Sequence, residues 1–524
     1  MAKVLVADAL SDVGVALLKG AGLEVDVNTG RTEDELVKLI GSYDALVVRS
    51  APKVTARIIE AGTQLKVIGR AGVGVDNVDV AAASRRGVIV MNTPLGNVTS
   101  AAEHAVAMLM ALARNIPGAD ASMKAGKWDK KSFTGVEVSE KTLGIVGMGK
   151  VGQIVAKAGI GLNMKVLAYD PFLPERRARE LGVEPATLDD VLAKSDFITI
   201  HTPLTDQTRG LLNEAALAKI KKGARLVNCA RGGIVDEVAL VKALEEGRLA
   251  GAAVDVFGTE PLPADSPLRK APHLILTPHL GASTEEAQTK VAEAIAQQIV
   301  AYFKEGKIQY AVNLSVTLTR EMEPFAELAR ALGKLLSQML PNPPQKLVTA
   351  AEGRIATEDT HALSVFALQG LLASWHDRLN VVNAPLVAEE RGIAIVEQKA
   401  FESRDYANLV RLTVETAKTT HTVAGTVFEG REVRITEIDG FSVDLKPEGT
   451  MLVLFYADRP GMVGKFGTIL GDAKINIAGM DVGRKEKRGR ACIALSVDDP
   501  VPADVVEKMR ACTGTGETYL VSFA

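Results

Sequence analysis

Residues 142–170 read TLGIVGMGKVGQIVAKAGIGLNMKVLAYD, and this stretch determines the fold of the region around it. An apolar run, LGIV, leads into three glycines at G-x-G-x-x-G spacing, Gly147, Gly149 and Gly152. A helical pattern follows, and the next apolar run ends in Asp170. In such a unit the first glycine permits a tight turn, the second lets backbone approach a pyrophosphate, and the third lets the helix pack on the strand. The stretch therefore predicts a strand–helix–strand unit that binds a dinucleotide at its helix N-terminus.

Asp170 indicates which dinucleotide is bound. It lies about 20 residues after the glycines, where a carboxylate accepts both ribose hydroxyls of NAD and repels the 2′-phosphate of NADP. Arg176 and Arg177 lie close by and weaken this argument slightly. The glycines alone would also fit an ordinary strand-to-helix turn, but the strand, helix and Asp in register favour an NAD site.

Similar apolar runs lie on both sides of this unit. VLVAD, ALVVRS and VIVMNTP belong to the first ninety or so residues, and FITIHTP, ARLVNCARGG and LILTPHLG follow the glycines. Their Val and Ile content without strict alternation is typical of parallel strands buried on both faces. We expect two doubly wound α/β lobes with ligands in the cleft beyond the carboxyl ends of the strands. The polar residues that end these runs are Arg49, Ser50, Arg70, Asp170, His201, Thr202, Arg231, Asp255 and His279.

The rest of the chain divides into two further regions. A helix is expected from Ser283 or Thr284 to about Lys304, because hydroxyl caps and early acidic residues suit a helix N-terminus. The last 75 residues alternate as strand, helix, strand, strand, helix, strand, which is ferredoxin-like. The predicted domains are a flavodoxin-like substrate-binding lobe (1–97 and 282–314), a Rossmann-like NAD lobe (98–281), an α+β intervening domain (315–449) and a ferredoxin-like domain (450–524).

Composition limits the function classes. The chain has 524 residues, 47% of them apolar, and a net charge of −3, so we expect no nucleic-acid or membrane partner. The cysteines Cys229, Cys492 and Cys512 fit neither a zinc site nor a disulfide framework, so no metal is expected. The N-terminal MAKVLVADAL lacks the features of a signal peptide, and we expect a cytoplasmic protein.

An Arg, a Glu and a His end successive segments of the second lobe. They are Arg231 in NCARGG, Glu260 in VFGTEP and His279 in LTPHLG. A His is the usual base near neutral pH, a carboxylate beside it supports its proton cycling, and an Arg fork suits a substrate carboxylate. His104 and His201 are rivals for the base, and a structural role for each residue remains open. Cys229 lacks an evident activating base, so we expect it to pack beside the cofactor.

The strings GRAGVGVDNVD, GMGKVG, NCARGGIVDE, AAVDVFGTEP and TPHLGAST resemble those of the D-isomer-specific 2-hydroxyacid dehydrogenases. The resemblance implies hydride transfer from C2 of a 2-hydroxy acid to NAD. It assigns Arg231 to the substrate carboxylate and carbonyl, His279 to acid/base work and Glu260 to the partner of His279. Besides the three glycines and Asp170, it implies NAD contacts from Lys150, Val151, Thr202, Cys229, Ala230, Asp255 and Gly281.

The first lobe supplies the candidates for substrate specificity. Two Arg residues aimed at one cleft suit a phosphate, and the family members that oxidise 3-phospho-D-glycerate bind substrate at these positions. Structural ion pairs for the two Arg residues stay open, as does reduction of glyoxylate, hydroxypyruvate or another 2-keto acid. The residues concerned are Arg49, Ser50, Arg70, Gly72 and Asn97.

The tail points to regulation. The string YADRPGMVGKFGTILGDAKINIAGM resembles an ACT domain, a module that pairs side by side and binds amino acids at the junction. The resemblance implies L-serine as effector, with contacts from Tyr456, Asp458 and Asn476. Residues 315–449 resemble the extra domain of the long family members, where Arg434 and Lys446 are candidates for an anion site, although solvated surface charges explain them as well.

Two expectations concern partners and class. The apolar helix 98–113 and a pairing ACT module favour a homo-oligomer, either a dimer or a tetramer. An NAD-sensing regulator similar to the C-terminal-binding-protein corepressors is the alternative outside enzymes, although those proteins lack an ACT-like tail. Measurable turnover separates the two classes.

Overall fold

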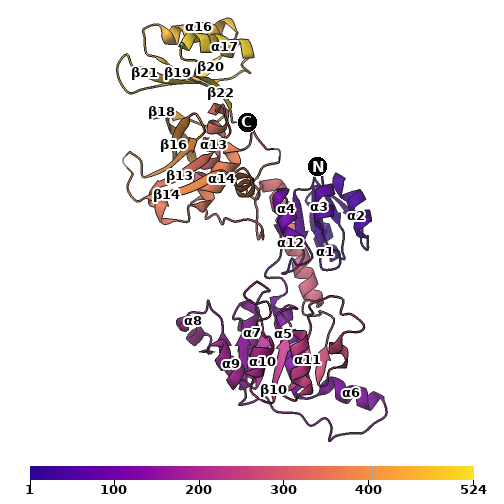
Figure 1. Ribbon diagram of the computed structural model, residues 1–524. Helices are drawn as coiled ribbons and strands as arrows, with labels where there is room; N and C mark the ends of the chain where they lie inside the picture. Colours follow the sequence, from indigo (N-terminus) through magenta and orange to yellow (C-terminus); the bar gives the residue numbers. More distant parts are fainter. Residues whose placement is uncertain (377, 404, 524) are drawn as a thin grey trace.

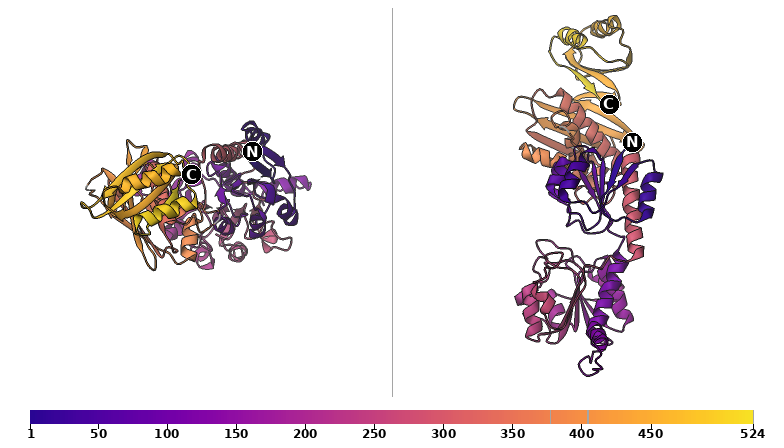
Figure 2. Two further views of the ribbon diagram at one scale, coloured as in Figure 1. Left: turned by 90° about the horizontal axis from the view of Figure 1, so that it is seen from above. Right: turned by 90° about the vertical axis from the view of Figure 1, so that its right-hand side faces the viewer.

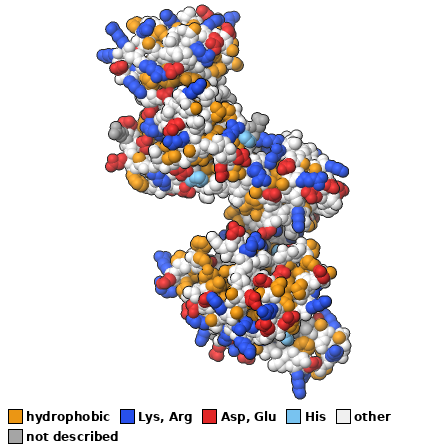
Figure 3. Space-filling model, viewed as in Figure 1, with side chains coloured by type: hydrophobic (Ala, Val, Ile, Leu, Met, Phe, Trp, Pro, Cys, Tyr) orange, Lys and Arg blue, Asp and Glu red, His pale blue; other side chains and the backbone are white. Residues whose placement is uncertain are grey.

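The structure, a computed structural model, describes residues 1–376, 378–403 and 405–523. Four β-sheets occupy successive stretches of the chain. Along the elongated molecule the unit of the second sheet lies at one end, followed by the units of the first, third and fourth sheets (Figures 1 and 2). On the face drawn in Figure 3, acidic and basic side chains are interspersed over all four units. None of the helices in the described ranges is long and apolar enough to cross a membrane.

The first unit is a five-stranded parallel sheet in the order β2-β1-β3-β4-β5, the flavodoxin-like order. Its core is completed by α12 (Glu285–Glu305), whose Val291, Ile295 and Ile299 pack against the sheet. The strands are β1 (Lys3–Val6), β2 (Glu24–Val27), β3 (Ala45–Val48), β4 (Val67–Arg70) and β5 (Ile89–Met91). The first lobe therefore combines the N-terminal residues with a helix from about 200 residues further along.

The second unit is a seven-stranded parallel sheet in the order β12-β11-β10-β9-β6-β7-β8. The strand order reverses between β6 and β9, and such a switch point is where open α/β sheets bind ligands. Helix α5 (Val98–Ala113) packs against α7 (Lys150–Gly161) on this lobe. The strands are β6 (Thr142–Val146), β7 (Lys165–Tyr169), β8 (Glu184–Pro185), β9 (Phe197–Ile200), β10 (Ala224–Asn228), β11 (Leu249–Val254) and β12 (Leu274–Leu276).

The third unit is a six-stranded mixed sheet in the order β14-β13-β15-β16-β17-β18. Helices α13 (Glu323–Met339), α14 (His361–Leu371) and α15 (Ala384–Glu390) contribute to its core. Asn380 Nδ2 donates a 2.6 Å hydrogen bond to Gly87 O and so links this unit to the first lobe. The strands are β13 (Lys346–Gly353), β14 (Ala394–Ala400), β15 (Asn408–Glu415), β16 (Thr420–Phe428), β17 (Glu432–Ile438) and β18 (Phe441–Leu445).

The fourth unit has the ferredoxin-like element order, with an antiparallel sheet in the order β20-β21-β19-β22. Helices α16 (Met462–Asp472) and α17 (Ala503–Thr513) pack on one face of this sheet. The other face contributes Val453, Phe455 and Cys492 to the core of the third unit. The strands are β19 (Thr450–Ala457), β20 (Ile477–Arg484), β21 (Arg490–Val497) and β22 (Thr518–Ser522). The predicted fold class is confirmed for both lobes and for the two units that follow.

Candidate active site

The glycine loop lies at the switch point of the second sheet. Gly147 has φ +99°, and a Cβ there would lie 2.8 Å from His201 C and from Thr202 Cγ2. A Cβ on Gly152 would lie 2.1 Å from Gly147 O, so the start of α7 packs directly on the turn. A Cβ on Gly149 would meet no heavy atom of the chain within 4 Å, so this backbone faces open space. Each glycine therefore fits the role predicted from the motif.

Asp170 follows β7 and lies against this loop. Its Oδ2 accepts a 2.8 Å hydrogen bond from Met148 N, and its Oδ1 accepts one of 2.8 Å from Phe172 N. A carboxylate has about four lone-pair sites, so acceptor capacity remains for ribose hydroxyls. Both neighbouring arginines, Arg176 and Arg177, form 3.0 Å ion pairs with Glu180. Glu180 thus partly neutralises the positive charge of the two arginines, which would otherwise favour the 2′-phosphate of NADP.

Other predicted cofactor residues surround the loop. Lys150 and Val151 form the first turn of α7, where free backbone N–H groups suit a phosphate. The Oγ1 atom of Thr202 is buried and has no hydrogen-bond partner within the described ranges. The donors and the open backbone at Gly149 therefore fit a dinucleotide. Ala230 and Gly281 lie on the loops after β10 and β12.

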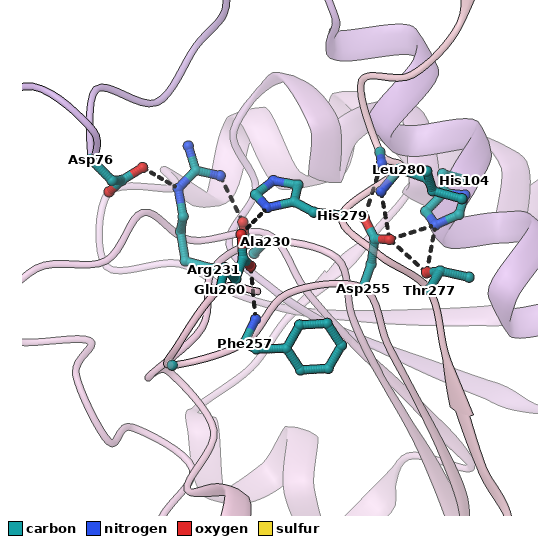
Figure 4. Close-up of polar contacts among 12 residues, drawn as sticks. Asp76, His104, Ala230, Arg231, Asp255, Phe257, Glu260, Thr277, His279 and Leu280 are labelled. Carbon is teal, nitrogen blue, oxygen red and sulfur yellow. Dashed lines mark hydrogen bonds and ion pairs between the residues drawn. The ribbon is translucent and has the colours of Figure 1, made fainter. Parts of the chain in front are cut away.

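The three catalytic candidates come from loops that follow β10, β11 and β12, which are neighbours in the sheet (Figure 4). His279 Nδ1 lies 2.7 Å from Glu260 Oε2, and Glu260 Oε1 accepts a 2.9 Å hydrogen bond from Phe257 N. A Cβ on Gly232 would lie 1.9 Å from Phe257 O, so the turn after Arg231 packs on the loop leading to Glu260. The structure thus brings the predicted Arg, Glu and His into one cluster.

The charge state of Glu260 determines which nitrogen of His279 is basic. Burial alone would raise the pKa of Glu260, but hydrogen bonds with His279 and Phe257 N–H outweigh it and hold this pKa below its ordinary value. An ionised carboxylate only accepts hydrogen bonds, so Nδ1 must carry the proton. This tautomer leaves Nε2 as the basic nitrogen, and 46% of the His279 side chain is exposed. His279 can therefore exchange a proton with a ligand in the cleft.

Asp255 holds the turn that carries His279. His279 has φ +56°, a left-handed conformation that costs a non-glycine residue about 1 kcal/mol or more. Asp255, fully buried, accepts hydrogen bonds from Leu280 N (2.7 Å) and Gly281 N (2.9 Å) on the far side of His279. It also accepts one from Thr277 Oγ1 (2.5 Å) on the near side. The buried carboxylate thus fixes the turn and the direction of the imidazole.

His104 reinforces this support from α5. Its Nε2 lies 3.2 Å from Asp255 Oδ1 and 3.3 Å from Thr277 Oγ1 (Figure 4). Burial would raise the pKa of Asp255, but hydrogen bonds from His104, Thr277 and Leu280 N–H hold it below its usual range. His104 therefore lies beneath the turn and not in the cleft, which favours the structural role considered for it.

The other rival base and the cysteine are both half-buried. Burial lowers the pKa of His201 to about 4, so its imidazole is neutral at physiological pH. Its Nε2 is hydrogen-bonded to Thr199 Oγ1 at 2.9 Å. Burial, with a smaller contribution from Asp255, raises the pKa of Cys229, so this thiol is no nucleophile at neutral pH. Neither residue has the exposed, charge-supported setting of His279.

The candidate substrate residues of the first lobe face Arg231. Arg70 ends β4, and a Cβ on Gly72 (φ +151°) would lie 1.5 Å from Arg70 Nη1, so only glycine lets this guanidinium lie there. Burial lowers the pKa of Arg70 to about 10, and the nearby cations Arg231 and Arg49 add to the shift. The Nε atom of Arg70 has no hydrogen-bond partner in the described part of the chain. Three guanidinium groups thus share one region of positive potential.

The remaining first-lobe candidates lie at the ends of elements. Arg49 follows β3 and donates a 3.2 Å hydrogen bond from Nη1 to Ala9 O. Ser50 is exposed beside it, and Asn97 caps α5 without a side-chain hydrogen bond. Sequence reasoning missed Asp76, whose Oδ2 pairs with Arg231 Nε at 3.2 Å across the two lobes. Asp76 lies in the string GRAGVGVDNVD, in the loop that follows the strand ending in Arg70. This position beyond the end of a parallel strand was the signal in the sequence that could have marked Asp76 as a site residue.

The effector candidates are spread over the fourth unit. Tyr456 is 1% exposed and packs edge-on against Phe466, so its ring belongs to the core of this unit. Asp458 pairs with Arg484 at 3.4 Å, whereas Asn476 donates a 2.6 Å hydrogen bond to Asp498. Asp458 lies beside the end of β20 and Asn476 just before its start. One chain therefore does not bring these two side chains together.

The anion candidates of the third unit are already paired. Arg434 forms ion pairs with Glu432 (2.7 Å) and Asp444 (3.2 Å), and Lys446 pairs with Glu432 at 2.9 Å. Lys446 and Glu432 line a hollow between α13 and the β17–β18 region, together with further residues of both signs. These contacts favour the surface-charge interpretation.

Comparison with known proteins identifies the family. Residues 106–281 match the D-isomer specific 2-hydroxyacid dehydrogenase NAD binding domain, residues 321–439 the D-3-phosphoglycerate dehydrogenase intervening domain, and residues 450–514 the ACT domain. D-3-phosphoglycerate dehydrogenase of Synechocystis sp. is 45% identical over 99% of this chain and 95% of its own length. The chain belongs to the D-3-phosphoglycerate dehydrogenase family. It is an NAD-dependent 2-hydroxyacid dehydrogenase by its domains and its relatives.

Further similar proteins include one relative over nearly the full length and two solved structures that cover 59% of this chain. D-3-phosphoglycerate dehydrogenase of Archaeoglobus fulgidus is 43% identical over 98% of both chains. The NAD complex of NAD-dependent formate dehydrogenase from Staphylococcus aureus has 32% identity and a TM-score of 0.54, covering 59% of this chain and 97% of that one. D-lactate dehydrogenase from Escherichia coli has 29% identity and a TM-score of 0.53, covering 59% and 99%.

Proposed function

We propose that the chain oxidises 3-phospho-D-glycerate to 3-phosphohydroxypyruvate with NAD, as the first step of L-serine synthesis. The observation that carries the mechanism is the 2.7 Å bond between His279 Nδ1 and Glu260, because it leaves the other ring nitrogen basic. Full-length relatives named D-3-phosphoglycerate dehydrogenase carry the substrate assignment.

The reaction divides among three side chains. The guanidinium of Arg231 holds the substrate carboxylate and polarises the C2 oxygen as it becomes a carbonyl. His279 Nε2 takes the proton of the C2 hydroxyl, and Glu260 stabilises the imidazolium that forms. NAD, held by the glycine loop and Asp170, would supply the acceptor for the C2 hydride when bound. For Arg231 to bind substrate, its contact with Asp76 must give way or rearrange as the lobes close.

The phosphate is recognised by the first lobe in this account. Arg70 and Arg49 supply the charge, and Asp76 and Asp8 balance only part of the positive potential around the Arg70 guanidinium, so a dianion would relieve the rest. An unphosphorylated acid would not provide this compensation. Glyoxylate and hydroxypyruvate have no phosphate, so in an enzyme that reduces them this region would hold more positive charge than the substrate balances.

Regulation and assembly follow from the tail. We assign L-serine as effector at a junction of two ACT modules, since Asp458 and Asn476 lie near opposite ends of β20 and an antiparallel pair of modules along that strand would bring them together. A homo-oligomer, dimer or tetramer, is required for that site. The exposed Ile116, Met123 and Trp128 in and beyond α6 (Ile116–Lys124) offer further apolar surface for a partner copy. We propose a cytoplasmic location for this biosynthetic enzyme.

The test is NADH formation from NAD with 3-phospho-D-glycerate or D-glycerate, each with and without L-serine. The proposal expects turnover of the phosphorylated acid, little with D-glycerate, and a lower rate with serine. Turnover of D-glycerate alone would replace the substrate by an unphosphorylated one. No turnover with either acid, with NAD binding intact, would support an NAD-sensing regulator. An unchanged rate and melting temperature with serine would remove only the effector assignment.

A further inference from the structure

Strand β14 (Ala394–Ala400) forms an open edge of the six-stranded sheet. It pairs in parallel with β13 (Lys346–Gly353), in unbroken register over seven residues, and nothing pairs with its other side within the described residues. Six of its seven residues are exposed. In Figure 1 this strand lies on the side of the third unit away from the first lobe. A regular edge without proline or bulge is a ready template for another strand.

Large apolar side chains lie at both ends of this edge. Ile395 is 39% exposed near the start of the strand, and Phe401, directly after the strand, is 72% exposed. Two separate apolar side chains on a surface are ordinary. Phe401 lies at the bend directly after the strand, so a strand added to this edge would cover Ile395 and end beside Phe401.

The sequence of β14 is complementary to itself in one register. In a two-fold antiparallel pair centred on Gln398, Glu397 lies opposite Lys399 twice, and each Ile395 lies toward the end of the partner strand, where Phe401 follows at a bend. Val396 then lies opposite Ala400, so both faces of the pair are free of like charges. Opposite charges stabilise directly facing positions, whereas like charges destabilise them.

The neighbouring registers lack this property. In a two-fold antiparallel pair, facing residues point to the same face of the sheet. The two-fold axis must therefore lie at a residue and not between two residues, so the neighbouring registers are those centred on Glu397 and on Lys399. Centring on Glu397 places two carboxylates opposite each other at the axis, and centring on Lys399 places two ammonium groups there. The charge pattern therefore selects the Gln398 register.

Contacts within the chain hold the two charged side chains along this edge. Glu397 Oε1 lies 2.8 Å from His361 Nδ1, and Lys399 Nζ donates a 2.7 Å hydrogen bond to Glu358 O. A carboxylate keeps further acceptor sites and an ammonium two further donors, so both groups remain able to pair across strands. The edge is thus partly preorganised.

We propose that two copies of this chain pair through β14, antiparallel about Gln398, and join their six-stranded sheets into one continuous sheet. The symmetry is isologous, so each contact occurs twice. This interface depends on none of the residues assigned to NAD, substrate or serine, and its failure would leave the proposed function unaffected.

A cysteine on the two-fold axis tests the register. In the Gln398→Cys variant of the full chain, the two Cα atoms would face each other within the range that a disulfide spans. Mild oxidation is expected to give a dimer band on a non-reducing denaturing gel, removed by dithiothreitol. The controls are the wild type, with its own cysteines, and Glu389→Cys, an exposed position on α15. Equal dimer yields for the two cysteine variants would overturn the proposal.

Charge exchange provides an independent test that does not depend on cross-linking. Lys399→Glu places carboxylates opposite each other twice, so association through this edge should weaken and the weight-average sedimentation mass at low protein concentration should fall below that of the wild type. The double variant Glu397→Lys with Lys399→Glu restores opposite charges and should restore the mass. His361→Gln, which removes only the contact within the chain, should keep it. Unchanged mass in Lys399→Glu, or no recovery in the double variant, would contradict the interface; turnover and melting temperature verify that each variant is folded.

Discussion

Two hydrogen-bonded His–carboxylate pairs in this molecule have nearly the same length and different surroundings. His279 Nδ1 lies 2.7 Å from Glu260 in the cleft of the second lobe, and His421 Nδ1 lies 2.8 Å from Asp439 in the third unit. The His279 side chain is 46% exposed and that of His421 is 11% exposed. Thus the pair itself does not distinguish a catalytic site from a structural one.

The difference lies in what surrounds each ring. His279 sits at the carboxyl end of a parallel strand, on a left-handed turn that Asp255 holds, with Arg231 on a neighbouring loop. His421 lies on β16, with its ring edge-on to Tyr519 of the fourth unit at 6.4 Å. The first arrangement leaves a basic nitrogen open to a ligand, while the second fills the space beside the ring with protein. The comparison predicts opposite consequences for the two histidines.

Removing the base should have the largest effect. His279→Gln keeps a polar side chain but has no proton acceptor of suitable basicity, so kcat should fall by about 10²- to 10⁴-fold. The melting temperature should stay close to that of the wild type, since the side chain is half-exposed. His421→Gln is the matched control and should keep its kcat, as measured by NADH formation. Similar losses in both variants would remove the distinction drawn between the two pairs.

Arg231→Lys keeps the charge of the proposed carboxylate clamp and loses its planar fork. A hydrogen bond to a charged group contributes about 1.5–3 kcal/mol, so kcat/KM should fall roughly 10- to 100-fold. Arg57→Lys, a surface position paired with Asp34, should leave kcat/KM unchanged. Wild-type kcat/KM in the Arg231 variant would show that this guanidinium does not bind the substrate.

Glu260→Gln should lower kcat by about tenfold or more at neutral pH. Burial alone would raise the pKa of Glu260, but its hydrogen bonds with His279 and Phe257 N–H hold this pKa below its ordinary value, so the group is an anion throughout the neutral range. The anion stabilises the imidazolium that forms when His279 takes the substrate proton, and a neutral glutamine cannot. In the wild type this support is lost only as the pH falls through the lowered pKa of Glu260, so the variant should lack that step in kcat. A wild-type kcat in the variant at neutral pH would contradict this coupling.

His421→Asn should affect stability only. The substitution leaves the half-buried Asp439 carboxylate with fewer hydrogen bonds, at a cost of about 1–3 kcal/mol, seen as a lower melting temperature. The corresponding change at the exposed pair, His361→Asn, should cost about 0–1 kcal/mol. A large loss of kcat in folded His421→Asn would place this histidine in the catalytic machinery after all.

Local elements were predictable because their signals are local. The helix expected at 98–113 is α5, and Thr284 caps α12 through a 3.2 Å hydrogen bond from Ala287 N. The glycine spacing predicted the steric needs of Gly147 and Gly152. The fold class is confirmed, whereas the domain boundaries and the roles of the site residues stay predictions.

Contacts between distant segments were not predictable from pattern alone. Nothing in a single sequence shows that Asp76 reaches Arg231 across the cleft, that Asp255 holds both sides of the His279 turn, or that Asn380 docks on Gly87. These contacts depend on how the units lie in three dimensions. Residues 315–449 gave the least information about their fold. They form a mixed sheet, whose strands do not share a single pattern of hydrophobic residues along the sequence.

The most direct test is an experimental structure of the chain with NAD and 3-phospho-D-glycerate bound. The account predicts the C2 hydroxyl within about 2.6–3.2 Å of His279 Nε2, the carboxylate on Arg231 and the phosphate beside Arg70. A substrate bound with its phosphate on Arg231, or with C2 remote from His279, would contradict the assignment of these residues.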